Sequence, residues 1–369
     1  MTAHATTLFD GNTVIVCRTR HATNPADRET FALDDVARSS VPSMRSALDH
    51  IRNFREVGSI KAPVGAKRRA LEQFLQAQSP DVMLIEQGQE AKFFWLSAKR
   101  LGIPVFVYFR GIDATGYLRP GRQQPNRIRS YRRMMKRIDG IFAVSQFLVD
   151  ELAGHGITHP VTHVIPSGVE TARFVPGDKR PRDVLMAGRL IDKKAPLVSI
   201  GAFISASASI ADAHLHIVGD GPRRLECENL VRRQGAQSKV TFHGYLEHQQ
   251  VAQMMATIPL FIQHSVTSKD NDKEGAPTSI QEAMACGMCV VSTRHAGIPN
   301  LIKDGVTGFL VDEHDDVSFA ERIHTMLSNP LECLEVGRHA RRIAERELDK
   351  PMLHRRLESI LQEHAKGRG

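Results

Sequence analysis

Short runs of apolar and β-branched residues alternate with helix-length segments along most of the chain. The first half contains VIVC (14 to 17), VMLI (82 to 85), VFVYF (105 to 109), IFAVS (141 to 145) and VTHVIP (161 to 166). Helical stretches such as AKRRALEQFLQA and EAKFFWLSAKRLG lie between them. The second half contains VLMAG, LHIVGDG, VTFHG, PLFIQHS, CVVST and GFLV. Such alternation is typical of βαβ units and parallel sheets, so it predicts an α/β protein.

Two blocks of alternation are separated by RFVPGDKRPRD, a polar and proline-containing segment at 173 to 183. We therefore predict two Rossmann-like, doubly wound domains that face a cleft, one at 1 to 174 and one at 175 to 345. We expect a C-terminal helix at 346 to 369 to pack back on the first domain. The first strand candidate comes only after DGNT, so the first domain is expected to lack its opening strand and glycine-rich loop.

The formal net charge is +8, and much of it is concentrated between residues 119 and 137. The basic residues there are Arg119, Arg122, Arg127, Arg129, Arg132, Arg133, Lys136 and Arg137. This segment is either a surface for phosphates, including anionic lipid headgroups, or a solvated helix face. Nucleic acid is not expected as a partner, because Tyr131 is the only aromatic residue interleaved with these charges.

Cysteine usage and hydropathy favour the cytoplasm. The five cysteines are scattered and odd in number, which is typical of a reducing compartment. Cys286 and Cys289 form a C-x-x-C without a second ligand pair nearby in the sequence, so we interpret them as buried structural residues. The sequence has no apolar run of about 18 residues and no secretory signal.

The segment EGAPTSIQEAMACG, residues 274 to 287, predicts a helix that begins near Pro277 at the end of a strand. Its first N–H groups and positive dipole end suit a phosphate group. Glu274 would precede that end and Glu282 would lie inside the helix. Carboxylates repel phosphate and accept hydrogen bonds from sugar hydroxyls. A phosphate flanked by two polyols is a nucleotide-sugar, which is our predicted ligand.

The loop AGRLIDKKAP directly follows the predicted strand VLMAG and supplies Arg189 and Lys194. A guanidinium and a mobile ammonium at a strand end are a common way to neutralise a diphosphate. A basic pair after a strand often belongs to an ordinary surface loop. The presence of Glu274 and Glu282 in the same predicted domain favours the functional interpretation.

Several elements together resemble glycosyltransferase family 4, whose members are retaining enzymes of the GT-B fold. They are E-x7-E from Glu274 to Glu282, GRL-x3-K from Gly188 to Lys194, VGDGP at 218 to 222, FHGY at 242 to 245 and GIP…DGVTGFLV at 297 to 311. The match covers the second domain, and weaker elements continue it into the first, including FRGIDAT at 109 to 115. The chain is most similar to transferases of exopolysaccharide, capsule and lipopolysaccharide synthesis, including colanic-acid-type enzymes with an HSVT loop.

The resemblance implies a hexosyltransferase at the inner face of the cytoplasmic membrane, with a glycan or polyprenyl-diphosphate-linked acceptor. It implies no metal and no cofactor beyond the nucleoside diphosphate sugar. Glu274 would contact the donor sugar, Glu282 the ribose, and Arg189 and Lys194 the diphosphate. The other implied donor-binding residues are Gly188, Gly219, Gly221, Gly244, Tyr245, His264, Gly275, Ala276, Pro277, Thr278 and Ser279.

The sequence departs from the family pattern at two places besides its start. Arg110 stands where a histidine commonly precedes the glycine of the element that here reads Arg110, Gly111 and Asp113. Asn300 stands where glutamate is usual. Arg110, Gly111 and Asp113 of the first domain are assigned to the cleft, although Asp113 is equally well explained as a turn residue. His264 has donor contact and loop packing as open alternatives. The D-x-D at 270 to 272 is interpreted as a chance pattern and not as a metal site.

Two other functions remain open from the sequence. A sugar-nucleotide 2-epimerase has the same fold and needs no acceptor. A pseudo-glycosyltransferase would bind a nucleotide or a partner without turnover, which Arg110, Asn300 and the expected loss of the opening strand favour.

Overall fold

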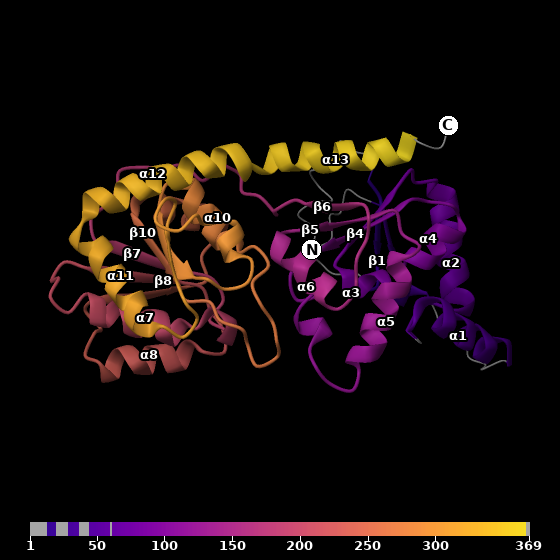
Figure 1. The fold of residues 1–369 in the computed structure, drawn as a ribbon, viewed down its shortest axis with the longest axis horizontal. Helices are drawn as coiled ribbons and strands as arrows, with labels where there is room; N and C mark the ends of the chain where they lie inside the picture. The colour runs from indigo at the N-terminus through magenta and orange to yellow at the C-terminus, as the bar shows by residue number, and fades with distance from the viewer. Residues whose placement is uncertain (1–12, 20–28, 37–43, 60, 367–369) are drawn as a thin grey trace. The chain divides into compact units, whose positions relative to one another are not determined.

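A computed structural model describes residues 13 to 19, 29 to 36, 44 to 59 and 61 to 366 of the chain (Figure 1). The chain forms two compact units, Met1–Ile165 together with His354–Gly369, and Pro166–Leu353. These limits differ from those predicted at 174 and 345. Each unit contains parallel sheets with helices between the strands, which confirms the predicted α/β class. Among the described residues, no helix has the length and apolar character needed to span a membrane.

The first unit has two parallel sheets. The smaller pairs β1 (Ile15–Cys17) with β2 (Thr30–Ala32), and the larger has the order β3 (Met83–Glu86), β4 (Val105–Phe109), β5 (Gly140–Ala143) and β6 (Thr162–Val164). All strands except β2 were predicted from their apolar runs. The expected loss of an opening strand ahead of β1 stays a prediction, because residues 1 to 12 lie outside the described part.

Helices connect these strands. They are η1 (Leu33–Asp35), α1 (Met44–Val57), α2 (Gly65–Gln78), α3 (Gly88–Ala91), α4 (Trp95–Arg100), η2 (Gly116–Leu118), α5 (Gln124–Met135) and α6 (Gln146–Gly154). The segment expected as one helix over EAKFFWLSAKRLG is divided into α3 and α4. Its consecutive residues Phe93, Phe94 and Trp95 are all buried, and successive side chains of a continuous helix point in directions too different for one apolar face.

The second unit contains a six-stranded parallel sheet. Its order is β12 (Phe309–Val311), β11 (Cys289–Thr293), β10 (Leu260–Gln263), β7 (Asp183–Ala187), β8 (His214–Val218) and β9 (Val240–Gly244). The chain fills the sheet outward from β7 in one direction and then from β10 in the other. This is the strand order of a dinucleotide-binding fold, whose ligands bind where the order reverses, beyond the carboxyl ends of the two central strands. Here those strands are β7 and β10.

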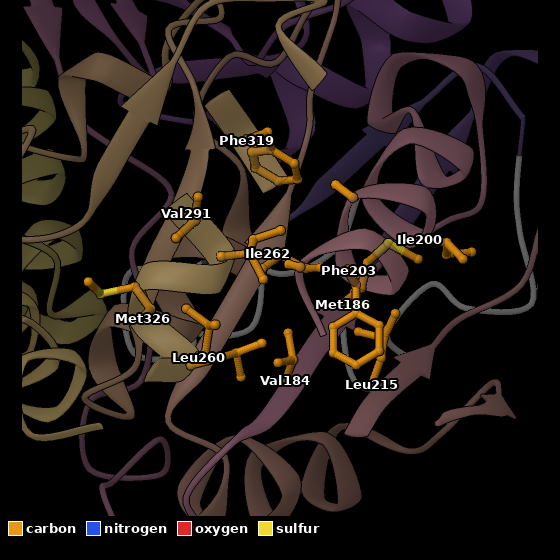
Figure 2. Close-up of a cluster of buried hydrophobic side chains, with 14 of the residues drawn as sticks. Val184, Met186, Ile200, Phe203, Leu215, Leu260, Ile262, Val291, Phe319 and Met326 are labelled. Atoms are coloured by element: carbon orange, nitrogen blue, oxygen red, sulfur yellow. The ribbon is translucent and has the colours of Figure 1, made fainter. Parts of the chain in front are cut away.

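Helices cover both faces of this sheet. They are η3 (Asp192–Lys194), α7 (Pro196–Ala206), α8 (Arg224–Arg233), α9 (His248–Thr257), α10 (Thr278–Ala285), η4 (Ile298–Asn300), α11 (Asp316–Ser328), α12 (Pro330–Glu347) and the start of α13 (Lys350–Lys366). Figure 2 shows Val184, Leu215 and Ile262 of the sheet with Phe203 of α7 and Phe319 of α11, all buried in one apolar cluster. This core fixes the strand ends at which the site is built.

The segment between β6 and β7 has no helix and no described strand, as its polar composition predicts. It is held by Lys179, whose Nζ donates to the carbonyl oxygens of Met255 (2.8 Å), Ile258 (3.0 Å) and Cys286 (2.8 Å). These carbonyls lie at the ends of α9 and α10, where helices leave acceptors unsatisfied. Burial lowers the pKa of this ammonium to about 8. Lys179 therefore ties the segment to the two helices.

We expect Lys179→Met to lower the free energy of unfolding by about 3 kcal/mol, because it leaves three carbonyl groups without their donor. Arg338→Met on α12 is the control, since its side chain is exposed, and it should change stability by less than about 0.5 kcal/mol. Urea denaturation of both variants measures the difference. Equal midpoints would contradict the role of Lys179.

Candidate active site

Two lysines and a glutamate meet beyond the carboxyl ends of β7 and β10, where the strand order reverses. Lys194 Nζ lies 3.1 Å from Glu274 Oε1, and Lys193 Nζ lies 3.9 Å from Glu274 Oε2. Glu274 is 7% exposed. Burial raises the pKa of its carboxyl group, but the Lys194 and Lys193 ammonium groups outweigh that effect and lower the pKa. Glu274 is therefore held as a buried carboxylate between two cations.

Gln263, the last residue of β10, connects this ion pair to α10. Its Oε1 accepts hydrogen bonds from Lys194 Nζ (2.9 Å) and Ser279 Oγ (3.1 Å), and its Nε2 donates to Ser265 Oγ (2.8 Å). The sequence analysis missed Gln263 because it lies within an apolar strand. It also missed Lys193, although the adjacent Lys194 was a signal for it.

Helix α10 begins at Thr278 with Pro277 as its N-cap, close to the predicted start, and no side chain of the described residues caps it. Gly275, Ala276 and Pro277 before it are buried, and Thr278 is exposed. An uncapped helix start leaves backbone N–H groups and a positive dipole end available for an anion. The helix begins close to where the sequence predicted, and phosphate binding at its start stays a prediction.

Glu282 lies one turn inside α10 and accepts a hydrogen bond from His248 Nε2 of α9 at 2.9 Å. This bond raises the pKa of His248, whose side chain is 55% exposed. His248 also packs edge-on against Phe174. The structure thus adds a histidine partner to Glu282 that the sequence analysis missed, because nothing in the spacing connects the two residues.

Glycines allow three strand-end loops to pack backbone against backbone. Gly188 N–H donates to the Val218 carbonyl at 2.9 Å, and Gly219 N–H donates to the Gly244 carbonyl at 2.7 Å. Gly219 has φ +123°, and a Cβ there would lie 2.1 Å from the Gly188 oxygen. Another residue at this position would separate the loops.

The remaining predicted donor-binding residues include both buried and exposed ones. A Cβ on Gly221 would lie 2.5 Å from the Leu190 oxygen, so this glycine serves the same close packing. Arg189 and Tyr245 are exposed, Tyr245 by 77%. His264 is fully buried, its ring contacts Phe319, and its Nε2 accepts the His314 N–H at 3.2 Å. These contacts favour the packing alternative for His264.

The D-x-D segment takes part in the lysine network. Asp272 Oδ2 lies 3.1 Å from Lys193 Nζ. The described residues contain no group of three or more potential metal ligands. Asp272 therefore shares Lys193 with Glu274.

In the first unit, Arg110 and Asp113 contact residues of β3 and β4 and of the segments that follow these strands. Arg110 Nε lies 2.5 Å from Glu86 Oε2, and its guanidinium stacks 4.3 Å from the Tyr108 ring centroid. Asp113 is fully buried and accepts N–H groups of Gly88 (2.8 Å), Arg110 (3.0 Å) and Gly111 (2.9 Å). Asp113 thus fastens the ends of β3 and β4 together, as the turn alternative predicts.

A histidine missed by the sequence analysis fixes the backbone of Glu274. His295 Nε2 accepts the Glu274 N–H at 3.1 Å, and His295 Nδ1 lies 2.6 Å from Glu313 Oε1. Glu313 Oε2 also accepts the Thr267 N–H at 2.9 Å. Because Nε2 must carry the lone pair, the proton lies on Nδ1 and is donated to Glu313. The pair therefore connects the loops after β10, β11 and β12.

Comparison with solved structures identifies the class of fold. HepE of Anabaena, solved with UDP, superposes with a TM-score of 0.70 at 19% identity, over 80% of this chain and 82% of that one. A glycosyltransferase of Rickettsia africae gives 0.71 at 18% identity, over 92% and 86%. These similarities, with the two parallel α/β units, define a GT-B glycosyltransferase fold.

The sequence comparisons are more specific. The family model for glycosyl transferases group 1 matches residues 169–344, and the glycosyl transferase 4-like domain matches residues 12–168. The chain belongs to glycosyltransferase family 4.

Among its relatives, a putative colanic acid biosynthesis glycosyltransferase of Escherichia coli is 29% identical over 70% of this chain. The amylovoran biosynthesis glycosyltransferase of Erwinia amylovora is 25% identical over 63% of it. The matches span 64% and 58% of the length of these two relatives.

We expect the stability of the second unit to fall on acidification partly through His295. Burial lowers the pKa of His295, and the nearby Lys273 ammonium lowers it further. The carboxylates of Glu313 and Glu274 raise this pKa, but their effect is the smaller one. Below the unfolded pKa of about 6.5, the unfolded chain binds a proton that the folded chain does not, so the free energy of unfolding falls as pH falls. One such group contributes at most about 1.4 kcal/mol per pH unit.

The measurement is urea denaturation of the wild type and His295→Gln at about pH 7 and about pH 5, where only histidines titrate strongly. The wild type should lose more stability than the variant between these values. An identical loss in both would show that His295 does not couple folding to protonation.

Proposed function

We propose that this protein is a retaining glycosyltransferase that moves a sugar from a nucleoside diphosphate sugar to a glycan or polyprenyl-diphosphate-linked acceptor in bacterial surface polysaccharide synthesis. The single observation that carries the proposal is the buried carboxylate of Glu274, held by Lys193 and Lys194 beside the uncapped start of α10. The names of the colanic acid and amylovoran relatives support the pathway class, and the UDP bound to HepE supports the donor class.

The residues would act by position and charge. Glu274 would accept hydrogen bonds from donor-sugar hydroxyls, and Glu282 would accept them from the ribose. Lys194, Arg189 and the N–H groups of α10 would stabilise the negative charge that develops on the departing diphosphate. Because these groups supply the positive charge, the proposal needs no metal ion.

Retention of configuration follows if the leaving diphosphate accepts the proton of the incoming acceptor hydroxyl. The C1–O bond to the diphosphate breaks while the acceptor oxygen bonds to C1 on the same face, and the proton passes to the diphosphate oxygen. The reaction needs no base from Arg110 or Asp113, because the diphosphate accepts the proton. Both residues are also engaged elsewhere, since Arg110 pairs with Glu86 and Asp113 accepts three backbone N–H groups.

Two alternatives have distinct products. A 2-epimerase would convert the nucleotide-sugar without any acceptor, and a pseudo-glycosyltransferase would bind the nucleotide without turnover. Product analysis with and without acceptor separates all three functions.

The first test is isothermal titration with UDP, GDP and ADP. One nucleotide should bind, and Glu282→Ala and Arg189→Ala should each weaken it about tenfold to a hundredfold, since each removes a hydrogen bond to or from a charged group. Arg338→Ala, an exposed substitution on α12, is the control and should bind normally. Absence of binding by all three nucleotides would overturn the donor-site assignment.

We also propose that the first unit binds the inner face of the cytoplasmic membrane. Within the basic segment, Arg129, Lys136 and Arg137 are exposed. The neighbouring helix α1 exposes Leu48 (60%), Ile51 (54%) and Phe54 (38%).

Arg133 of α5 donates to the Phe54 carbonyl at 2.7 Å, which places the apolar side chains of α1 next to the basic helix. Apolar residues beside cations suit the headgroup region of an anionic bilayer. The exposed charges fit both this proposal and the solvated-face alternative, and vesicle binding separates them.

The full chain should sediment with vesicles of phosphatidylglycerol and phosphatidylcholine, and much less with phosphatidylcholine alone. Lys136→Glu with Arg137→Glu should weaken binding at least tenfold, because each basic residue near such a surface contributes about 1 kcal/mol. Arg338→Glu is the matched control of charge reversal. Equal binding by the double variant and the control would favour the solvated-face interpretation.

A further inference from the structure

Three cations and two aromatic rings alternate in the first unit. Arg18 Cζ and Lys92 Nζ lie 5.6 Å and 5.0 Å from the Phe93 ring centroid. Lys92 Nζ and Arg127 Cζ lie 5.3 Å and 4.7 Å from the Tyr117 ring centroid. We call these five residues the cation ladder. Attraction of each cation to the aromatic rings holds the three charges near one another.

The cation ladder is assembled from segments far apart in the sequence. Arg18 follows the carboxyl end of β1, Lys92 ends α3 after β3, and Tyr117 lies in η2 after β4. Arg127 comes from α5 and donates to the Tyr117 carbonyl at 2.6 Å. Loops beyond the carboxyl ends of parallel strands are where α/β folds bind their ligands. The ladder thus has the location of a binding site.

Its positive charge is poorly neutralised. Within the described residues, the one ion pair of the ladder joins Arg18 Nη1 to Glu90 Oε1 at 4.0 Å. Lys92 Nζ instead donates to the Gln89 carbonyl at 2.8 Å. Burial lowers the pKa of Lys92, Glu90 opposes this, and Lys61, Arg18 and Arg127 lower it further. Among the described residues, the three cations therefore share the single carboxylate of Glu90.

Like charges held together cost free energy that a bound anion would recover. Aromatic faces attract cations but carry no net charge, so the rings bring the cations together without neutralising them. A guanidinium and an ammonium together match the several oxygens of a phosphate ester. Arg18 keeps 52% of its side chain exposed, so an anion has access to the ladder.

We propose that the cation ladder is a binding site for a phosphate or diphosphate ester, and that it holds the diphosphate of a lipid-linked acceptor. The second part rests on the proposed function. Every member of the ladder belongs to the first unit, whereas Lys193, Lys194 and Glu274 belong to the second.

The test is isothermal titration of the full chain with inorganic pyrophosphate and farnesyl diphosphate. Lys92→Met should weaken both at least tenfold and leave nucleotide binding unchanged. Lys92→Arg keeps the charge and should retain binding. Lys194→Met should weaken nucleotide binding and leave the ladder intact. Any pyrophosphate binding that remains in this variant therefore does not come from the donor site.

Each outcome decides a separate point. Pyrophosphate binding that is absent in Lys194→Met, or that is unaffected when Lys92→Met is added to Lys194→Met, overturns the ladder as a site. Failure of nucleotide binding with retained pyrophosphate binding overturns the donor assignment alone.

Two further arms complete the test. If Lys92→Met does not fold, as judged by thermal unfolding, Arg18→Gln at an exposed position replaces it with the same expected loss. Phosphatidylglycerol vesicles are the third ligand. If Lys92→Met weakens vesicle binding but not farnesyl diphosphate binding, the ligand is a membrane headgroup and the acceptor assignment is overturned.

Discussion

The buried ion pair between Glu274 and the two lysines is the interaction on which the second unit's site depends. A carboxylate that is almost fully buried would be protonated without nearby cations, and a protonated carboxyl is a much weaker acceptor for sugar hydroxyls. Removing one partner from such a pair leaves an uncompensated charge and costs about 3 to 5 kcal/mol. The same contact therefore joins the loops after β7 and β10 and sets the charge state of Glu274.

Neutral groups hold the pair in place. Gln263 orients Lys194 and Ser279 through one carbonyl oxygen, while His295 accepts the Glu274 N–H and Gly297 N–H donates to the Glu274 carbonyl at 3.0 Å. Groups fixed before substrate binds need little reorganisation when charge develops on a leaving group. The rigidity of Glu274 thus derives from β10, β11 and β12 together.

The sequence predicted those features that depend on local pattern. Apolar runs identified the strands, and strand ends indicated Lys194 and Glu274, because the carboxyl ends of parallel strands share one edge. Gln263, His248 and His295 could not be predicted, since their partners are distant in sequence and their residue types are common. The same holds for Arg18 and Lys92 of the cation ladder. The break between α3 and α4 depends on packing of three adjacent aromatic residues, which propensity does not indicate.

Arg110 stands at a position where the family pattern has a histidine, and this difference removes a group that can exchange a proton without adding net charge to the loop. The family pattern has a histidine there, which can exchange a proton near neutral pH, whereas a guanidinium cannot. Glu86 lies at the end of the neighbouring strand and neutralises Arg110, while Tyr108 covers the guanidinium face. The arginine therefore adds no net charge to this loop and cannot act as a base. Arg110 is thus less suited to bind a phosphate than the cation ladder, whose cations lack such close carboxylate partners among the described residues.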